Sequence, residues 1–376
     1  MPGPTPLRWQ SLPEDQQRLN KNKIIKKTAY KLKGQEMKSN YFTKVSLGCL
    51  LCLLTAMVGC CCINIGDWGK EKYEKTERLS APLAAGGILA VETDVGSITI
   101  TGADVADCNV TAEICVKAPT EKEAQQIAEQ VKIQLEQVGE TLTIKIEKPR
   151  VKKKRSIRVS FNIIVPKQIN IECASSRGPT ELTNIKGNVK GKTSRGSITA
   201  ENIHGSLELN TSRGSITCKD ISSDNINLET SRGNVRLSKA SCGSLKLKSS
   251  RGNINVSEST ADMANISSSR GHITYQNVTT TDLTANSSRG NINIAYLPSA
   301  AGEITANITA SRGNVRFVAP PSFSGQVELT TSRGSIKTDL PITVQGKITE
   351  ERIKGTIGEG KGILRLKTSR GSIEIR

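Results

Sequence analysis

The sequence predicts an all-β protein built as a parallel β-solenoid, and two observations support this fold class. The tripeptide Ser-Arg-Gly occurs ten times from residue 176 onward, and six consecutive intervals between its arginines are 18 or 19 residues long. Between the tripeptides, polar and apolar residues alternate as they do in strands. A short fixed period is typical of stacked coils that bury their apolar faces against one another. We therefore expect a single-stranded β-helix with coils of 18 to 19 residues and one helix near its N-terminal end.

The alternation within one coil predicts its cross-section. In the coil that follows Thr211, the inward positions are Thr211, Ile216, Cys218, Ile221 and Ile226. Residues an odd number of positions apart face opposite sides of a strand, so each odd interval between two inward residues requires a turn. Three such intervals, of five, three and five residues, occur in this coil. The coil should therefore have three corners and a roughly triangular cross-section.

The Ser-Arg-Gly tripeptide lies at the first corner of each coil. Glycine suits a corner because it enters positive φ without steric cost, and a turn former follows it in nearly every copy, as at Ser197 and Asn234. Arginine should face the solvent, because a stack of buried and unpaired guanidinium groups would be strongly destabilising. The exposed column that results, the arginine ladder, consists of Arg177, Arg195, Arg213, Arg232, Arg251, Arg270, Arg289, Arg312, Arg333 and Arg370.

The last third of the chain departs from the strict period. Residues 298–301 and 320–322 lengthen two intervals and predict small bulges at corners. The long interval before Arg370 holds one degenerate copy at 354–357, which predicts a coil without its arginine. The chain finishes on the alternating segment 372–376, with no cap after it. We therefore expect an unpaired sheet edge there and weak end-to-end self-association through it.

Residues 86–175 are predicted to form an N-terminal β region ahead of the repeat solenoid at 176–376. Thr120 and Glu123 form a capping box that begins a helix, predicted at 120–138, and this helix should cover the first coil so that no sheet edge is exposed. Its apolar stripe consists of Ala124, Ile127, Ala128, Val131, Leu135 and Val138. Alternating segments predict strands at 88–93, 97–101, 141–146 and 157–165.

Composition argues against several kinds of site. Aromatic residues make up 3% of the chain, which suits thin coils filled by aliphatic side chains. Five of the ten cysteines lie in one apolar stretch and the others show no paired spacing, so neither a disulfide framework nor a zinc site is predicted. Cys173 and Cys218 occupy inward strand positions, where cysteine acts as a small hydrophobe. His204 and His272 are predicted as polar corner residues, and we expect no catalytic residue, no metal and no cofactor.

Residues 37–59 have the organisation of a signal peptide of the lipoprotein type. Lysines precede an apolar run at 45–58, and Gly59-Cys60 follows it. Met57-Val58-Gly59-Cys60 resembles the bacterial lipobox, in which the signal is cleaved before the cysteine and a lipid is attached to its sulfur. We therefore expect lipidation of Cys60. Residues 1–36 are then a non-native or cytoplasmic extension, and 60–85 are predicted to be a linker.

The alternative for the N-terminus is a signal anchor. The apolar stretch at 45–65 has about the length that spans a bilayer, and the six lysines between positions 21 and 33 fit a basic cytoplasmic tail. Both interpretations place the chain after residue 66 outside the cytoplasm and attach it to a membrane. The predicted location is therefore the bacterial cell envelope.

The span 86–376 resembles the putative-adhesin family of bacterial envelope proteins, known as domain of unknown function 4097. The resemblance depends on an opening Val91-Glu92-Thr93 and Gly96-Ser97-Ile98-Thr99-Ile100, on Ile164-Val165-Pro166-Lys167, and on the repeated Thr-Ser-x-Gly-x-Ile. It implies a β-solenoid in the cell envelope and no established catalytic residues. The uniform arginine between serine and glycine departs from what we expect of the family.

The ladder has two explanations. Arginine is present at all ten corners, although other exposed positions of the coils have diverged, as Thr199, Arg236 and Asn255 illustrate. The arginines could be structural, with their stems on the neighbouring coil and their donors on corner carbonyls. They could instead bind an anionic polymer that carries phosphate, uronate or sulfate groups, a task for which the bidentate guanidinium is better suited than lysine. The second explanation predicts an adhesin or scaffold with an anion-binding edge.

Two other functions compete with this one. The net charge of +18 and a basic run at 148–158 favour a nucleic-acid-binding protein, but the export signal and the scarcity of aromatic stacking platforms count against it. The basic run is interpreted as a solvated hairpin tip. A polysaccharide-degrading β-helix enzyme would need a cluster of acids or metal ligands confined to one coil, and no coil supplies paired carboxylates beside an insertion.

Overall fold

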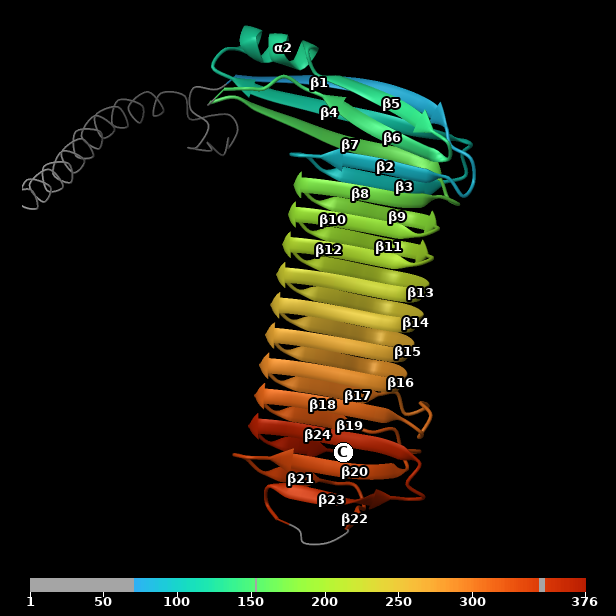
Figure 1. Ribbon diagram of the computed structural model, residues 1–376, viewed down its shortest axis with the longest axis vertical. Helices are drawn as coiled ribbons and strands as arrows, with labels where there is room; N and C mark the ends of the chain where they lie inside the picture. The colour runs from blue at the N-terminus through green and yellow to red at the C-terminus, as the bar shows by residue number, and fades with distance from the viewer. Residues whose placement is uncertain (1–70, 153, 345–348) are drawn as a thin grey trace, which may run out of the picture. The chain divides into compact units, whose positions relative to one another are not determined.

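The computed structural model describes residues 71–376, except 153 and 345–348. These residues belong to one compact unit, Gly69–Arg376, whose strands stack in a single direction (Figure 1). The predicted signal region, the lipidation site Cys60 and the extension before them lie outside the described residues. Among the residues described, no helix is both long and apolar enough to cross a membrane.

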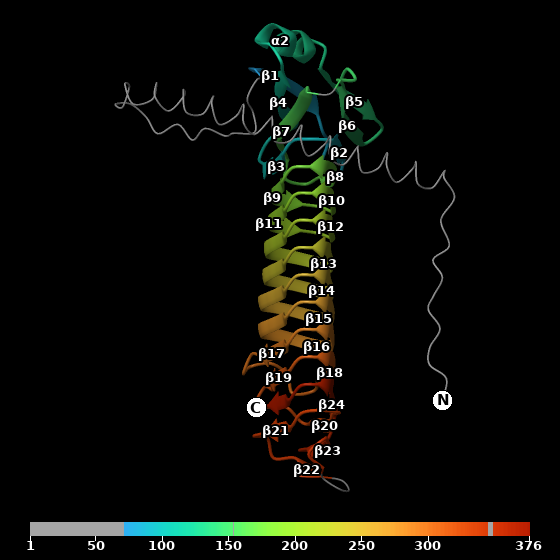
Figure 2. The same ribbon diagram turned by 90° about the vertical axis from the view of Figure 1, so that its left-hand side faces the viewer.

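The repeats form the predicted parallel β-solenoid, in which each coil contributes strands to two columns. Equivalent residues of successive coils pair at the same register, so that Ile198 pairs with Ile216 and Leu207 with Ile226. One column contains β8 (Asn170–Arg177), β10 (Val189–Arg195) and β12 (Leu207–Arg213), and the other contains β9 (Thr180–Lys186) and β11 (Ile198–His204). Each of the next four coils is one long bent strand that contributes to both columns (Figure 2): β13 (Ile216–Arg232), β14 (Val235–Arg251), β15 (Ile254–Arg270) and β16 (Ile273–Arg289).

Burial confirms the three corners per coil. In β13, Ile216, Cys218, Ile221, Ile226 and Leu228 are buried, and the residues between them face outward. A residue with positive φ marks the second corner in six successive coils, and these residues are Asn184, Asn202, Asp220, Lys239, Glu258 and Asn277. Asparagine tolerates the left-handed region well, but lysine and glutamate do not. The stacking of the coils therefore holds the backbone at this corner in the left-handed region, even where the residue is lysine or glutamate.

Antiparallel strands cover the N-terminal end of the stack. The solenoid begins with β2 (Ile88–Thr93) and β3 (Ile98–Ala103), and the coil beyond them consists of β6 (Thr141–Glu147) and β7 (Ser156–Pro166). β5 (Lys132–Val138) pairs with β6, and β4 (Asp107–Ala118) pairs with β7, both in antiparallel orientation. β1 (Glu71–Pro82) pairs in turn with β4. The four strands predicted in this region are confirmed within three residues at their ends. The free sheet edges are thus protected by further strands.

The predicted helix and linker need correction. The helix α2 runs only from Glu121 to Glu129, with Thr120 as its N-cap and Gln130 as its C-cap, and residues 132–138 form β5. Val131 and Ile133 are buried two residues apart, so the strand alternation in this segment prevails over the helical stripe. α2 packs on β1 and β4 and does not cover the first coil. Residues 71–82 of the predicted linker are strand β1, whose half-buried positions include the charged Lys75 and Glu77, so its sequence shows no clear apolar alternation.

The C-terminal coils are interleaved. β17 (Ile292–Tyr296), β18 (Thr305–Arg312) and β19 (Val315–Val318) continue the stack, but the next strands along it are β24 (Gly362–Arg370) and β25 (Ile373–Ile375), the last of the chain. Only then follow β20 (Gly325–Thr331) and β21 (Ile336–Thr338). Antiparallel β23 (Arg352–Ile357) and β22 (Thr343–Val344) finish the stack beyond β20.

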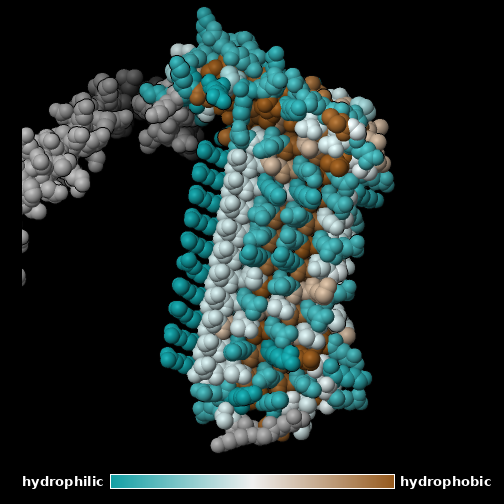
Figure 3. Space-filling model, in the orientation of Figure 1, coloured by the Kyte–Doolittle hydropathy of each residue, from teal (hydrophilic) through white to brown (hydrophobic). Residues whose placement is uncertain are grey.

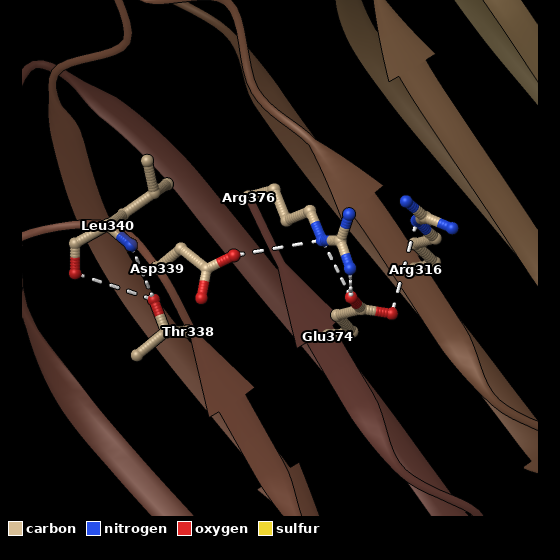
Figure 4. A network of polar contacts seen from close by, with 6 residues as sticks. All are labelled: Arg316, Thr338, Asp339, Leu340, Glu374 and Arg376. Atoms are coloured by element: carbon tan, nitrogen blue, oxygen red, sulfur yellow. Dashed lines mark hydrogen bonds and ion pairs between the residues drawn. The ribbon is translucent and has the colours of Figure 1, made fainter.

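This arrangement overturns two expectations. The final strand is paired on both sides, by β19 and β21, so it offers no free edge, and the predicted self-association through it loses its basis. The segment 354–357 lies in β23, which is antiparallel to β20, and so it is not a degenerate parallel coil. Charged contacts follow the interleaving (Figure 4): Glu374 accepts from Arg376 at 2.6 Å and lies 3.9 Å from Arg316, while Arg376 lies 3.7 Å from Asp339.

Candidate functional site

The arginine ladder is one continuous column. Strand pairing aligns Arg177 with Arg195, and each later arginine with the next, as far as Arg312. Arg312 pairs with Arg370, and the Gly371 amide donates to the Arg333 carbonyl at 3.0 Å, so the last two arginines stand in reversed sequence order. At a strand spacing of about 4.8 Å, the ten arginines extend over about 43 Å.

All ten ladder side chains are exposed, and none makes a hydrogen bond or ion pair with any residue that the structure describes. Figure 3 shows hydrophilic side chains projecting in a row along the edge where β8, β10 and β12 end. The sequence prediction that the arginines share one edge is therefore confirmed. Their guanidinium groups remain available to a ligand.

Corner carbonyls are occupied by the chain itself, which explains why the arginines do not bind them. Nine of the ten corner glycines, all except Gly334, donate their N–H to the arginine carbonyl of the next coil, as Gly196 does to Arg213 at 3.0 Å. In most coils the glycine carbonyl accepts from a buried serine or threonine hydroxyl two residues before the next arginine, as Gly196 does from Thr211 at 3.0 Å. Ala310 breaks this hydroxyl column, and the buried Thr193 hydroxyl makes no hydrogen bond in it. The structural explanation, with guanidinium donors on corner carbonyls, is not observed at any of the ten corners.

Close stacking, more than positive φ, requires glycine at the corner. A Cβ built on Gly196 would lie 1.8 Å from the Gly178 carbonyl oxygen, and one on Gly252 would lie 1.9 Å from that of Gly233. Gly252 also has a φ of +156°, at the edge of the region that favours glycine. The expected conformational reason applies at seven of the ten corners, whereas the steric one applies at all ten. The sequence could not reveal this clash, because it arises between coils.

A second polar column, which the sequence analysis did not identify, follows the glycines. From Ser197 onward, the side chain after the corner glycine accepts the backbone N–H of its counterpart in the next coil: Asn234 accepts from Asn253 at 2.9 Å, and the Nδ1 of His272 accepts from Asn291 at 3.0 Å. His272 therefore has the role of an asparagine in this column, which agrees with its prediction as a corner residue. His204 is likewise at a corner, with its Nε2 3.2 Å from the Asn202 side chain.

A shallow polar hollow of about 280 Å³ lies beside the middle of the ladder. It is lined by hydroxyl and amide groups of adjacent coils, among them Ser267, Asn286 and Thr309, and by Lys248. The tripeptide serines Ser269 and Ser311, next to ladder arginines, also line it. The five residues before each of the arginines from Arg251 to Arg312, and before Arg370, include no acid. The hollow thus offers neutral hydrogen-bonding groups and positive charge together.

The described cysteines are free thiols. Cys108, Cys173, Cys218 and Cys242 are buried, as predicted for the two inward ones, and burial raises the pKa of the Cys173 thiol to about 12. A thiol held neutral in this way is a poor nucleophile and metal ligand. These cysteines therefore act as core residues.

The basic run at 148–158 connects β6 to β7. The Lys148 ammonium pairs with Asp94, and Arg155 pairs with Glu123 at 2.5 Å, so the two ends of the loop are held to the body of the protein. Arg150, Lys152 and Lys154 are exposed. The sequence interpretation as a solvated tip is thus correct for the middle of the loop and incomplete for its ends.

The family model described as Toastrack DUF4097 matches residues 88–376. Similar solved structures include a putative adhesin from Parabacteroides distasonis (13% identity, TM-score 0.41, covering 80% of this chain and 97% of that chain). Another is a putative adhesin from Parabacteroides merdae (15% identity, TM-score 0.39, 80% and 96%). A third is a putative adhesin from Bacteroides fragilis (15% identity, TM-score 0.34, 80% and 97%). No curated protein matches the chain.

Proposed function

Because the chain belongs to the Toastrack DUF4097 family, we propose that it is a non-enzymatic cell-envelope lipoprotein of adhesin type whose arginine ladder binds an anionic polymer. One observation carries the proposal: ten exposed guanidinium groups stand in a single column without partners among the described residues. Neighbouring arginines repel by about 0.9 kcal/mol in water at about 4.8 Å before screening. A bound row of anions turns this repulsion into attraction.

The class of polymer follows from the groups beside the ladder. The polar hollow along β14 to β18 provides hydroxyl, amide and ammonium groups that match the hydroxyls of a sugar chain. Guanidinium groups bind carboxylate or sulfate in bidentate fashion. An anionic polysaccharide, with acidic groups toward the ladder and hydroxyls toward the hollow, uses both features.

A nucleic acid fits this surface less well. Single strands bind through aromatic platforms on which bases stack, and the described tyrosine and phenylalanine residues on β15 to β19 are buried in the core. The positive charge of the ladder therefore attracts the phosphate groups of a nucleic acid, but the bases find no exposed aromatic side chain on β15 to β19 on which to stack. Nucleic-acid binding remains an outcome of the test below.

The proposal is tested on a panel of immobilised polymers with the full-length protein in nonionic detergent. The panel contains polyuronates, sulfated polysaccharides, polyphosphate, single-stranded DNA and neutral glucans. Binding to acidic polysaccharides that weakens steeply with salt is expected, with weak binding to neutral glucans. Equal binding to neutral and acidic chains, or binding to DNA alone, would contradict it.

We propose further that Cys60 carries the lipid that attaches the protein to a membrane. The supporting observation is the apolar segment that ends at Gly59-Cys60 after basic residues. Mass spectrometry of the membrane fraction should find a mature chain that begins at a lipid-modified Cys60. A mature chain that retains residues 38–59 would favour the signal anchor instead.

A further inference from the structure

The register of the arginine ladder continues beyond Arg177 into the N-terminal coils. In the repeats, the corner glycines except Gly334 donate their N–H to the ladder carbonyl of the next coil, as Gly178 does to Arg195 at 2.9 Å. The same bond joins Gly96 to Arg177 at 2.8 Å, and the Val159 N–H to the Val95 carbonyl at 2.8 Å. Val95 therefore occupies the ladder position of one coil, and the residue before Val159 occupies that of the outermost coil. This residue is Arg158.

Two other columns give the same register. The Thr93 hydroxyl donates to the Val159 carbonyl at 3.0 Å, as the buried hydroxyl of a repeat donates to a corner glycine. The Ser160 hydroxyl accepts from the Ser97 N–H at 3.3 Å, as the side chains after the corner glycines do. Ile157-Arg158-Val159 is thus the counterpart of Ser-Arg-Gly. Arg158 is exposed, and its backbone occupies the position that corresponds to a ladder arginine.

The basic loop, of which the structure describes residues 148–152 and 154–155, stands at the corner of this outermost coil. β6 and β7 are the two strands of the coil, and the loop connects them where the repeats have their tripeptide. Lys148 pairs with Asp94, which is next to the ladder position Val95, and Arg155 pairs with Glu123. These pairs neutralise Asp94 and Glu123. Arg150, Lys152 and Lys154 are exposed and add further positive charge at this corner.

We propose that Arg158 with Arg150, Lys152 and Lys154 forms the N-terminal end of the anion-binding edge, so that one linear acidic polysaccharide lies over both the ladder and the loop. The inference rests on the proposed function. The edge then spans twelve coils and about 53 Å, against about 43 Å for the ten repeats alone. A chain long enough to cross the gap at Val95 gains the contacts of the loop without losing those of the ladder.

The test compares two size fractions of a sulfated oligosaccharide, one shorter than the ten-arginine ladder and one longer than the whole edge. The variant R150Q/K152Q/K154Q/R158Q leaves both ion pairs of the loop intact. It should lose about tenfold in affinity for the long fraction and have a shallower salt dependence, because fewer counterions are released on binding. Its affinity for the short fraction should stay close to that of the wild type, since ten arginines remain.

The matched control is K186Q/K239Q/K337Q/K354Q, which removes the same charge from exposed lysines outside the edge. It should bind both fractions like the wild type. The variant V95R fills the gap in the column and should bind the long fraction more tightly. Unchanged long-chain affinity in the loop variant, or equal losses for both fractions, would overturn the inference. Failure of the wild type to bind either fraction would instead overturn the proposed function.

Discussion

Each residue of the repeated tripeptide has a separable role. Glycine is required by the close approach of neighbouring coils, and the buried hydroxyl before the tripeptide occupies the glycine carbonyl. The side chain after glycine accepts a backbone N–H of the next coil. Arginine alone makes no contact of this kind among the described residues. Its presence at every corner therefore supports the proposed role of the ladder in binding an anionic polymer.

The steric role of glycine predicts a large difference between two similar substitutions. Gly252→Ala would bring a Cβ to 1.9 Å from the Gly233 carbonyl oxygen, so the coils must separate, and the free energy of unfolding should fall by about 1–3 kcal/mol or more. Gly243→Ala is the control, because its Cβ would meet its nearest atom, the Asp224 carbonyl oxygen, at 3.2 Å. Chemical denaturation followed by circular dichroism measures both. Equal losses would argue against close stacking as the reason for glycine.

Charge repulsion in the ladder predicts that its removal stabilises the fold. In R232Q/R251Q/R270Q/R289Q, each relieved neighbouring pair contributes up to about 0.9 kcal/mol before screening. The melting temperature should therefore rise at low salt, and the difference from the wild type should shrink at high salt. A melting temperature below that of the wild type at every salt concentration would show instead that the arginines hold the coils together.

At the scale of the element, the sequence predicted the regular coils well and the ends of the stack poorly. The repeat period and the odd intervals between inward residues located the corners, because every repeated coil has the same alternation of inward and outward residues. The segment 131–138 carries both a helical stripe and an alternation, and only its packing beside β6 decides in favour of strand β5. β1 is an edge strand with a single partner, β4, so charged residues are tolerated along it. The period of the sequence does not specify the order in which the coils stack. The position of β24 and β25 between the coil of β18 and β19 and the coil of β20 and β21 could therefore not be predicted.

The interleaved order predicts which corners can be cross-linked. Adjacent strands are about 4.8 Å apart, within the range of Cα separations that a disulfide spans, whereas strands two coils apart are about 9.6 Å apart. The pair R312C/R370C should therefore form a disulfide on oxidation, and the pair R312C/R333C should not. Peptide mapping by mass spectrometry distinguishes them. A disulfide between positions 312 and 333 would indicate that the coils stack in sequence order.

At the scale of the whole described unit, the proposed function depends on the stacking of identical corners. A single exposed arginine is unremarkable, but the parallel register places ten of them on one edge beside a face without acids over five coils. The sequence predicted this edge, because the arginine recurs once per coil. The polar hollow and the register of Arg158 were not predictable, because both arise from the way in which neighbouring coils stack.

The salt dependence of polymer binding tests the central claim most directly. Affinity for an acidic polysaccharide is measured over a series of salt concentrations for the wild type and for R232Q/R251Q/R270Q/R289Q. If the ladder contacts the polymer, the slope of log affinity against log salt becomes shallower by about one unit for each arginine removed that contacts an anionic group, and the affinity falls. The same slope and affinity in both proteins would contradict the assignment of the ladder as the binding site.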